Sequence, residues 1–268
     1  MVLVKLIAID LDDTLLRTDC TISPRAQAAI KAASARGVAV TLATGRMYRS
    51  ARPYALELGL DLPLITYQGA LIKSGLSGEE LWHCPLPPEM AAEIITLARE
   101  EGIHANIYLD DHLYVEKATA EAEAYSQLAR VPYTVEEDLR GRILASGQGP
   151  SKILLIAEPE RLDQLAAALR PRWQGKVQLA KSKDHYLEFT HPEASKGQAL
   201  IALCRYLDLE LKDAMAIGDS FNDLDMIELA GIGVAMGNAK PEVKAIADYV
   251  TLANDDDGVA EAIHRFVL

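Results

Sequence analysis

Cysteine, positive charge and long apolar runs are all scarce in this sequence. The three cysteines, Cys20, Cys84 and Cys204, are far apart, and no CxxC pair or Cys/His ligand spacing occurs. A disulfide framework is therefore not expected, and reduced thiols favour a cytoplasmic location. No segment approaches the ~18 apolar residues of a membrane-spanning helix. A charge as early as Lys5 also argues against a signal peptide.

Basic residues are too few to balance the acidic ones. The chain has 27 lysines and arginines against 39 aspartates and glutamates, which gives a formal net charge of -12 at pH 7. This charge argues against nucleic acid or an anionic membrane as a partner. A small anionic substrate would need local positive charge, from a metal ion or from a placed lysine or arginine. The sequence leaves the oligomeric state open, and a monomer is compatible with it.

The order of apolar runs and helical patterns predicts an α/β fold. Buried strands are expected at residues 6–9, 38–42 and 64–67, with helices between them, and this alternation is typical of a Rossmann-like parallel sheet. After residue 84 the pattern changes to an α+β one, with a hairpin turn at Asp110-Asp111. The parallel pattern returns near residue 189. We therefore predict a discontinuous core of residues 1–84 and 189–268, and an inserted α+β cap domain of residues 85–188.

Polar residues follow three of the expected core strands, after Ile9, Leu42 and Ile217. Parallel strands place these loops at one edge of the sheet, where ligands bind in open α/β folds. Converging carboxylates need a cation, and a set of oxygen ligands favours Mg²⁺. The alternative is that Asp219 and Asp223 only mark a helix N-terminus. Helix capping accounts for one acidic residue but not for five polar residues at one edge of the sheet. The residues gathered in this way would be Asp10, Asp12, Thr44, Asp219 and Asp223.

Two further features point to a bound anion. Lys196 falls in the first turn of an expected helix, where the helix dipole disfavours a cation by up to ~1 kcal/mol. An anion held between this lysine and the carboxylates would explain its position. Thr44 and Gly45 offer a hydroxyl and a backbone N–H at a strand-to-helix turn, which can hold a phosphate. Each feature taken alone also fits a simpler interpretation, an exposed lysine and a helix cap.

Taken together, these residues resemble the four ordered motifs of the haloacid dehalogenase superfamily. The motifs are DxDxT at residues 10–14, the Thr44 of ATGR, Lys196 before a glycine, and GDxxND ending at Asp223. The α+β segment between the second and third motifs resembles that of the Cof-type phosphatase branch. One departure is Gln68, where relatives usually carry asparagine, and a contact between core and cap is expected to differ there.

The resemblance implies a Mg²⁺-dependent phosphatase that acts on small phosphorylated metabolites, sugar phosphates first, through an aspartyl-phosphate. Asp10 would be the nucleophile and Asp12 the general acid and base. The magnesium ligands would be Asp10, the main-chain carbonyl of Asp12 and Asp219, with support from Asp223. The phosphoryl oxygens would be held by the backbone of Leu11 and by Thr44, Gly45, Lys196 and Asn222.

Two alternatives to this function stay open at the level of the sequence. The first is a phosphomutase of the same superfamily, which would return the phosphoryl group to another hydroxyl. The second is a non-catalytic phosphoacceptor module resembling a response-regulator receiver, in which an aspartate at a strand end is also phosphorylated. The second residue of the Asp10/Asp12 pair and the insert of roughly 100 residues both count against the receiver.

Overall fold

The computed structural model describes residues 3–268 and divides them into two compact units. Unit 1 holds the described residues up to Gly45, together with Ala51–Trp82 and Ser195–Leu268. Unit 2 holds Arg46–Ser50 and His83–Ala194. That these units are independently folding domains remains a proposal. Within residues 3–268, every helix is too short or too polar to cross a membrane.

A five-stranded parallel sheet forms the centre of unit 1. Its order is β14-β13-β12-β1-β2, and strand β1, which is paired on both edges, has the fully buried sequence LIAI. Strands buried on both faces are typical of parallel sheets covered by helices, and the predicted α/β class is therefore confirmed. The strands are β1 (Leu6–Ile9), β2 (Ala39–Leu42), β12 (Ala214–Gly218), β13 (Ile232–Ala235) and β14 (Tyr249–Val250).

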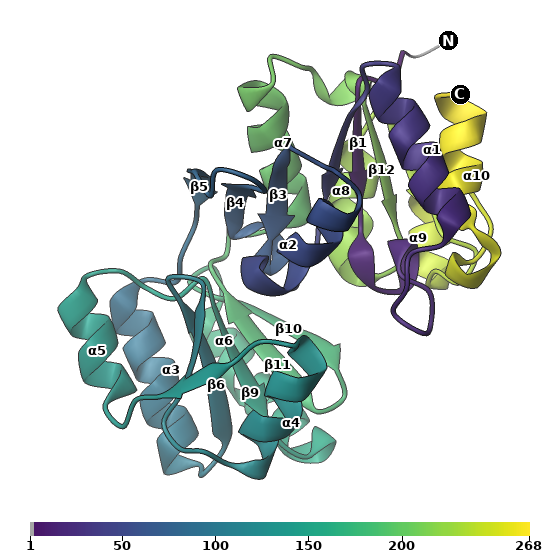
Figure 1. Ribbon diagram of the computed structural model, residues 1–268. Coiled ribbons are helices and arrows are strands. Elements are labelled where there is room, and N and C mark those ends of the chain that lie inside the picture. The colour runs from purple at the N-terminus through teal and green to yellow at the C-terminus, as the bar shows by residue number, and fades with distance from the viewer. Residues whose placement is uncertain (1–2) are drawn as a thin grey trace. The chain divides into compact units, whose positions relative to one another are not determined.

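Helices cover both faces of this sheet. Figure 1 shows α1 and α10 side by side on one side of β1 and β12, with α7 and α8 on the other. Local residues fix the start of helix α1, because Ser23 accepts a hydrogen bond from the N–H of Ala26 and Pro24 takes the first helical position. The helices are α1 (Pro24–Ala35), α7 (Lys196–Tyr206), α8 (Leu224–Leu229), α9 (Pro241–Ile246) and α10 (Gly258–Phe266), with short turns η3 (Leu211–Asp213) and η5 (Asn254–Asp256).

The predicted strand at residues 64–67 belongs to a separate small sheet. Strand β3 (Pro63–Thr66) pairs antiparallel with β4 (Leu71–Ser74) across the short turn η2 (Tyr67–Gly69), and β5 (Glu80–His83) follows in the same sheet. An isolated parallel bridge between Ala43 and Ile65 links β3 to the end of β2. The buried strand is therefore present, but its expected place in the parallel sheet was wrong, because apart from this bridge its register is with β4. Helix α2 (Tyr48–Glu57) begins in unit 2 and continues in unit 1.

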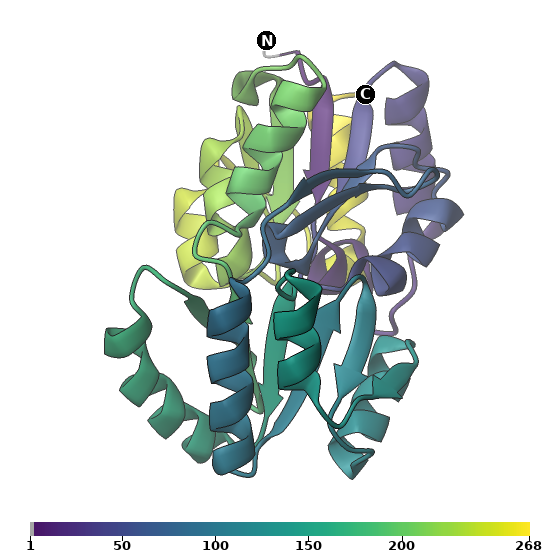
Figure 2. The same cartoon turned by 90° about the vertical axis from the view of Figure 1, so that its left-hand side faces the viewer.

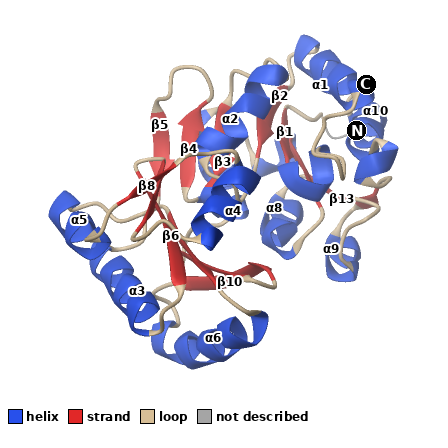
Figure 3. Cartoon of the chain, turned by 60° about the horizontal axis from the view of Figure 1, so that its bottom comes forward, coloured by secondary structure: helices blue, strands red, loops and turns tan. Residues whose placement is uncertain are grey.

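Unit 2 is built on a six-stranded sheet of order β10-β11-β9-β6-β7-β8. The predicted hairpin is present, with Asp110 and Asp111 both at positive φ (52° and 55°) between β6 and β7. Figure 2 shows α3, α5 and α6 in front of this sheet, and Figure 3 shows α4 on its other side. The elements are α3 (Pro88–Glu100), β6 (His104–Leu109), β7 (His112–Val115), α4 (Ala120–Ala129), β8 (Tyr133–Val135), α5 (Leu139–Ser146), β9 (Lys152–Ile156), α6 (Pro159–Trp173), β10 (Gln178–Lys183) and β11 (Tyr186–Thr190).

A hydrophobic core of its own holds unit 2 together. Apolar side chains of α3, α5 and α6 pack on one face of the sheet, and the ring of Trp173 meets that of Phe189 edge-on at 6.0 Å between centroids. Such aromatic pairs stabilise a core by about 0.5–1.5 kcal/mol beyond the area they bury. Other buried members of this cluster are Ile94, Ile107, Ile143, Leu155 and Leu162.

Candidate active site

The loop after β1 places the first two aspartates in different environments. The N–H of Asp10 still donates to the carbonyl of Ile217 in the neighbouring strand, at 2.9 Å, so Asp10 is held at the end of the sheet. The chain then makes the tight turn η1 (Leu11–Leu15), inside which Asp12 has extended dihedrals and Asp13 has φ 57°. As a result Asp10 and the side chain of Leu11 are buried, whereas Asp12 is exposed to solvent.

Lys196 joins the first and last sequence motifs. Its Nζ donates to Oδ1 of Asp10 at 2.5 Å and to Oδ1 of Asp223 at 2.6 Å, and all three residues are buried. Lys196 opens helix α7, whose N-cap Ser195 accepts a hydrogen bond from the N–H of Gln198 at 3.1 Å. The alternative of an exposed lysine is therefore wrong, and the cation that the helix dipole disfavours is compensated by two carboxylates.

The loop after β12 is organised by Asp223. Its Oδ2 accepts the backbone N–H groups of Asp219 and Ser220, both at 3.0 Å, which closes the short turn η4 (Phe221–Asp223). Its other oxygen, Oδ1, accepts from Lys196. The capping role that the sequence offered for Asp223 is thus real for this turn, but the same carboxylate also reaches the lysine.

Asp219 is oriented by a residue that the sequence reasoning left out of the site. The hydroxyl of Thr14 is buried and donates to Oδ1 of Asp219 at 3.1 Å. Thr14 was visible as the last position of the DxDxT motif, and its spacing from Asp10 was the signal available. It ties the loop after β1 to the loop after β12.

The carboxylates carry more negative charge than Lys196 neutralises. Burial raises the pKa of Asp10 well above its usual value, and the charges of Asp223 and Asp219 add to this, while Lys196 opposes it. Burial and the nearby Asp223 also raise the pKa of Asp219, to about 7. Burial lowers the pKa of Lys196, but Asp10 and Asp223 outweigh that effect and the net shift is upward. Raised carboxylate pKa values of this kind indicate that the ionised cluster needs a further cation for charge balance.

The donor set at this point suits a hard divalent metal ion. Carboxylate oxygens of Asp10, Asp219 and Asp223 all lie within 4.8 Å of one another. Oxygen ligands alone are typical of Mg²⁺ and Ca²⁺ sites rather than of zinc sites. The residues therefore fit the metal that the resemblance implies.

A second group of predicted residues gathers around Gln68. The amide of Asn222 donates from Nδ2 to Oε1 of Gln68 at 2.8 Å. The backbone carbonyl of Thr44 accepts a hydrogen bond from the backbone N–H of Gln68 at 3.1 Å. Gly45 lies so close that a Cβ on it would fall 2.4 Å from Nε2 of Gln68. Gln68 therefore joins three residues predicted to bind phosphate, a role that the sequence did not reveal because the residue was noted only as a departure from asparagine.

The turn that carries Gln68 is fixed against the start of α7. Gly69 has φ 94°, and a Cβ at this position would fall 2.0 Å from the carbonyl oxygen of Ser195. Only glycine allows both this dihedral and this approach. The turn η2 and Lys196 are in this way held to the same part of unit 1.

Comparison with known proteins identifies the class of protein that this fold and site define. The haloacid dehalogenase-like hydrolase family matches residues 7–263, and the chain belongs to that family. The resemblance drawn from the motifs is confirmed, and the protein is a phosphoric monoester hydrolase, a phosphatase.

Individual relatives cover nearly the whole chain. The 5-amino-6-(5-phospho-D-ribitylamino)uracil phosphatase YwtE of Bacillus subtilis is 32% identical over 98% of this chain and 98% of its own. The HMP-PP phosphatase of Serratia proteamaculans is 34% identical over 90% of this chain and 87% of its own. Among solved structures, a haloacid dehalogenase-like hydrolase from Bacteroides thetaiotaomicron has a TM-score of 0.89 at 32% identity, with 98% and 99% of the two chains covered.

Proposed function

We propose that this phosphatase is Mg²⁺-dependent and hydrolyses small phosphorylated metabolites, sugar phosphates first, through a phosphoaspartate at Asp10. The observation that carries the proposal is the buried contact of Lys196 with both Asp10 and Asp223. It brings the first, third and fourth motifs to one place and leaves one more carboxylate, that of Asp219, beside them.

Asp10, Asp219 and the main-chain carbonyl of Asp12 would hold the magnesium ion, with Asp223 in support. Bound there, Mg²⁺ would supply charge neutralisation for the phosphoryl group and would favour the ionised form of the carboxylates. Lys196 fixes the orientation of the Asp10 carboxylate through Oδ1. A fixed carboxylate at the end of a buried strand is a suitable nucleophile because its geometry is set before substrate arrives.

The covalent steps use Asp10 and Asp12. A carboxylate oxygen of Asp10 attacks phosphorus, the bond from phosphorus to the ester oxygen breaks, and Asp12 donates a proton to the departing alkoxide. Asp12 then takes a proton from water, the water oxygen attacks phosphorus, and Asp10 is released together with inorganic phosphate. The exposure of Asp12 supports this role, because a proton shuttle must reach both the leaving group and water.

The phosphoryl oxygens would be held by groups that lose little entropy on binding. Gln68 positions Asn222 and lies against Gly45, so these groups are ordered in the absence of substrate. Preorganised donors of this kind account for much of the rate enhancement in phosphoryl transfer. We propose this role for the backbone of Leu11 and for Thr44, Gly45, Lys196 and Asn222.

Recognition of the leaving group is proposed for unit 2. On its α4 side, the ring of Tyr125 meets those of Tyr108 and Tyr186 edge-on, at 6.3 and 5.9 Å between centroids. Nearby in the same unit, His104 pairs with the buried Asn106 at 2.9 Å. Polar and aromatic groups of these kinds suit a sugar or another small polar moiety, and two of the relatives are named as phosphatases of small molecules.

The test is a screen of phosphorylated metabolites with Mg²⁺, read as release of inorganic phosphate, beside p-nitrophenyl phosphate. Release that depends on Mg²⁺, with a sugar phosphate among the best substrates, is the expected result. Transfer of the phosphoryl group to a second sugar hydroxyl without phosphate release would instead favour the phosphomutase. Phosphorylation by acetyl phosphate without turnover of any ester would favour the receiver.

A further inference from the structure

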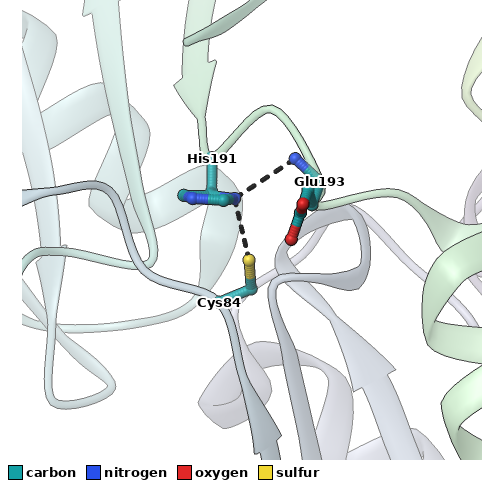
Figure 4. A group of neighbouring side chains, drawn as sticks. All are labelled: Cys84, His191 and Glu193. Carbon is teal, nitrogen blue, oxygen red and sulfur yellow. Dashed lines mark hydrogen bonds between the residues drawn. The ribbon is translucent and has the colours of Figure 1, made fainter. Parts of the chain in front are cut away.

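A second group of metal-ligating side chains lies in unit 2 and shares no residue with the aspartate group of unit 1. Figure 4 shows Cys84, His191 and Glu193 turned toward one another. Sγ of Cys84 is 2.9 Å from Nδ1 of His191, and the backbone N–H of Glu193 donates to the same nitrogen at 3.2 Å. One ligand atom from each residue lies within 4.8 Å of the other two. The cysteine and histidine are 107 residues apart, so no sequence spacing could reveal the group.

The hydrogen bonds identify the state of the histidine. A backbone N–H can only donate, so Nδ1 of His191 must be the unprotonated nitrogen that accepts from Glu193. The contact with Cys84 is then a thiol S–H donated to that same nitrogen. An imidazole lone pair facing a thiol proton is the arrangement in which a metal ion can replace the proton, because ligation needs a neutral imidazole and a thiolate.

The surroundings argue against a reactive, catalytic cysteine. Burial raises the pKa of the Cys84 thiol, and the negative charge of Glu193 raises it further. A thiol kept protonated in this way is a weak nucleophile, since the thiolate is the attacking form. The same carboxylate that disfavours a thiolate alone would stabilise a cation bound beside it.

We propose that Cys84, His191 and Glu193 form a binding site for Zn²⁺. Sulfur, imidazole nitrogen and carboxylate oxygen are the three donor types that zinc prefers, and three protein ligands leave a fourth position for water. In a tetrahedral zinc site the ligand atoms are roughly 3.5 Å apart, so Sγ and Nδ1 need to separate only slightly. Binding breaks the S–H bond, forms the zinc–thiolate bond and releases one proton to solvent. Because Glu193 is exposed, the ion can enter without the unit unfolding.

The site would tie together the two ends of one chain segment. Cys84 directly follows β5, whereas His191 and Glu193 follow β11, and these positions lie at the start and the end of His83–Ala194. A metal ion that is bound only when both ends are in place stabilises the folded form of the segment by mass action. The donor types also separate the two sites of the chain, with zinc at sulfur and nitrogen and a hard cation at the aspartates.

The experiment uses Co²⁺ as a spectroscopic substitute for zinc. Co²⁺ is titrated into the full-length protein in excess Mg²⁺, and the thiolate-to-cobalt charge-transfer absorption in the near ultraviolet is recorded. We expect the band to saturate at one equivalent, to disappear when Zn²⁺ is added, and to be lost in Cys84→Ser and His191→Gln. The matched variants Cys20→Ser and Cys204→Ser should keep the band, because these thiols lie outside the group.

Absence of the band in the unaltered protein, or its survival in Cys84→Ser, overturns the proposal. The fold of each variant is checked by circular dichroism and by Mg²⁺-dependent phosphatase activity, which none of these substitutions should remove. A second measurement needs no variant. Zn²⁺ should slow alkylation of Cys84 by iodoacetamide in the unaltered protein and should raise its thermal unfolding midpoint. Alkylation of Cys84 at an unchanged rate in saturating Zn²⁺ would contradict the site by itself.

Discussion

Each unit of the molecule buries a lysine against carboxylates, and the two arrangements differ in charge. In unit 2, Nζ of Lys152 donates to Oε1 of Glu188 at 3.2 Å, and the hydroxyl of Ser182 donates to the same oxygen at 2.8 Å. This is one ammonium for one carboxylate. In unit 1, Lys196 stands among the carboxylates of Asp10, Asp219 and Asp223, three carboxylates for one ammonium, which leaves a formal excess of two negative charges.

The difference shows that burial of a lysine is not by itself a sign of catalysis. In a balanced pair such as Lys152 and Glu188, the two opposite charges compensate each other. An unbalanced cluster is stable in the ionised state only when a further cation joins it, and a divalent metal ion would meet this requirement. The following predictions test that contrast, from the largest expected effect to the smallest.

The largest effect is expected for the proposed nucleophile. Asp10→Asn should lower phosphate release by at least ~10³-fold, because an amide cannot form an acyl-phosphate and is a poor magnesium ligand. Steady-state assays with p-nitrophenyl phosphate measure this loss, and Asp163→Asn, an exposed aspartate of unit 2, is the matched control. A well-folded Asp10→Asn protein with near-normal turnover would remove Asp10 from its role.

The second effect concerns the proton shuttle and depends on the substrate. Asp12→Asn should reduce the rate with an alkyl phosphate by ~10²–10⁴-fold, the usual contribution of general acid–base catalysis. With an activated aryl ester the first chemical step should change far less, because a good leaving group needs no proton. Single-turnover rates on the two substrates give the comparison, and equal losses on both would speak against Asp12 as the general acid.

The third prediction compares the two buried lysines directly. Lys152→Met removes the charged partner of the buried Glu188 and should lower the free energy of unfolding by about 3–5 kcal/mol. Adding Glu188→Leu should restore most of that stability, because an apolar pair can replace a balanced ion pair. The double variant Lys196→Met with Asp223→Leu should have a free energy of unfolding no higher than that of the Lys152→Met with Glu188→Leu protein. It should also be inactive. Denaturant titrations and phosphate-release assays on the same proteins measure the two effects. An active Lys196→Met enzyme would contradict the proposed difference between the two lysines.

The smallest effect is a difference in pH dependence between the units of the metal-free protein. The pKa of Asp219 is raised in the folded state from 3.8 to about 7, so stability from the protonated group is present below pH 4 and is lost as the pH rises toward 7. Burial lowers the pKa of His104 below 6.5. The stability contributed by its neutral imidazole is therefore present above pH 6.5 and is lost as the pH falls. Amide hydrogen exchange in β12 and β6 measures the two trends, and parallel trends would contradict the account.

The parts of the fold that the sequence predicted are those with strong local signals. The buried run of β1 and the Asp110-Asp111 hairpin both follow from neighbouring residues. Strand β8 (Tyr133–Val135) and helix α5 (Leu139–Ser146) were not anticipated, because β8 has only three residues, largely exposed, and α5 is short and weakly amphipathic. Strand β3 was assigned to the wrong sheet because its pairing is decided by the hairpin that follows.

The candidate site divides in the same way. Asp10 and Asp223 could be grouped from the sequence because parallel strands bring their loops to one edge. Lys196 could be added from its place at a helix start and from the order of the motifs. The contact of Thr14 with Asp219 spans 205 residues and depends on the shape of η1, which has no simple periodicity. The link between Gln68 and Asn222 spans 154 residues and rests on the turn η2, whose three residues all have positive φ. The DxDxT motif pointed to Thr14 itself, but neither contact partner could be predicted from local sequence.

The central claim is that Asp10 forms a phosphoaspartate and that Asp12 is needed to hydrolyse it. It is tested most directly by mixing Asp12→Asn with p-nitrophenyl phosphate and Mg²⁺, quenching in acid, and locating phosphate in peptides by mass spectrometry. We expect a burst of p-nitrophenol approaching one equivalent, with phosphate on the peptide that contains Asp10, and neither in the presence of a chelator. Steady turnover without a burst and with no phosphate on that peptide, or phosphate attached to a different residue, would contradict the account.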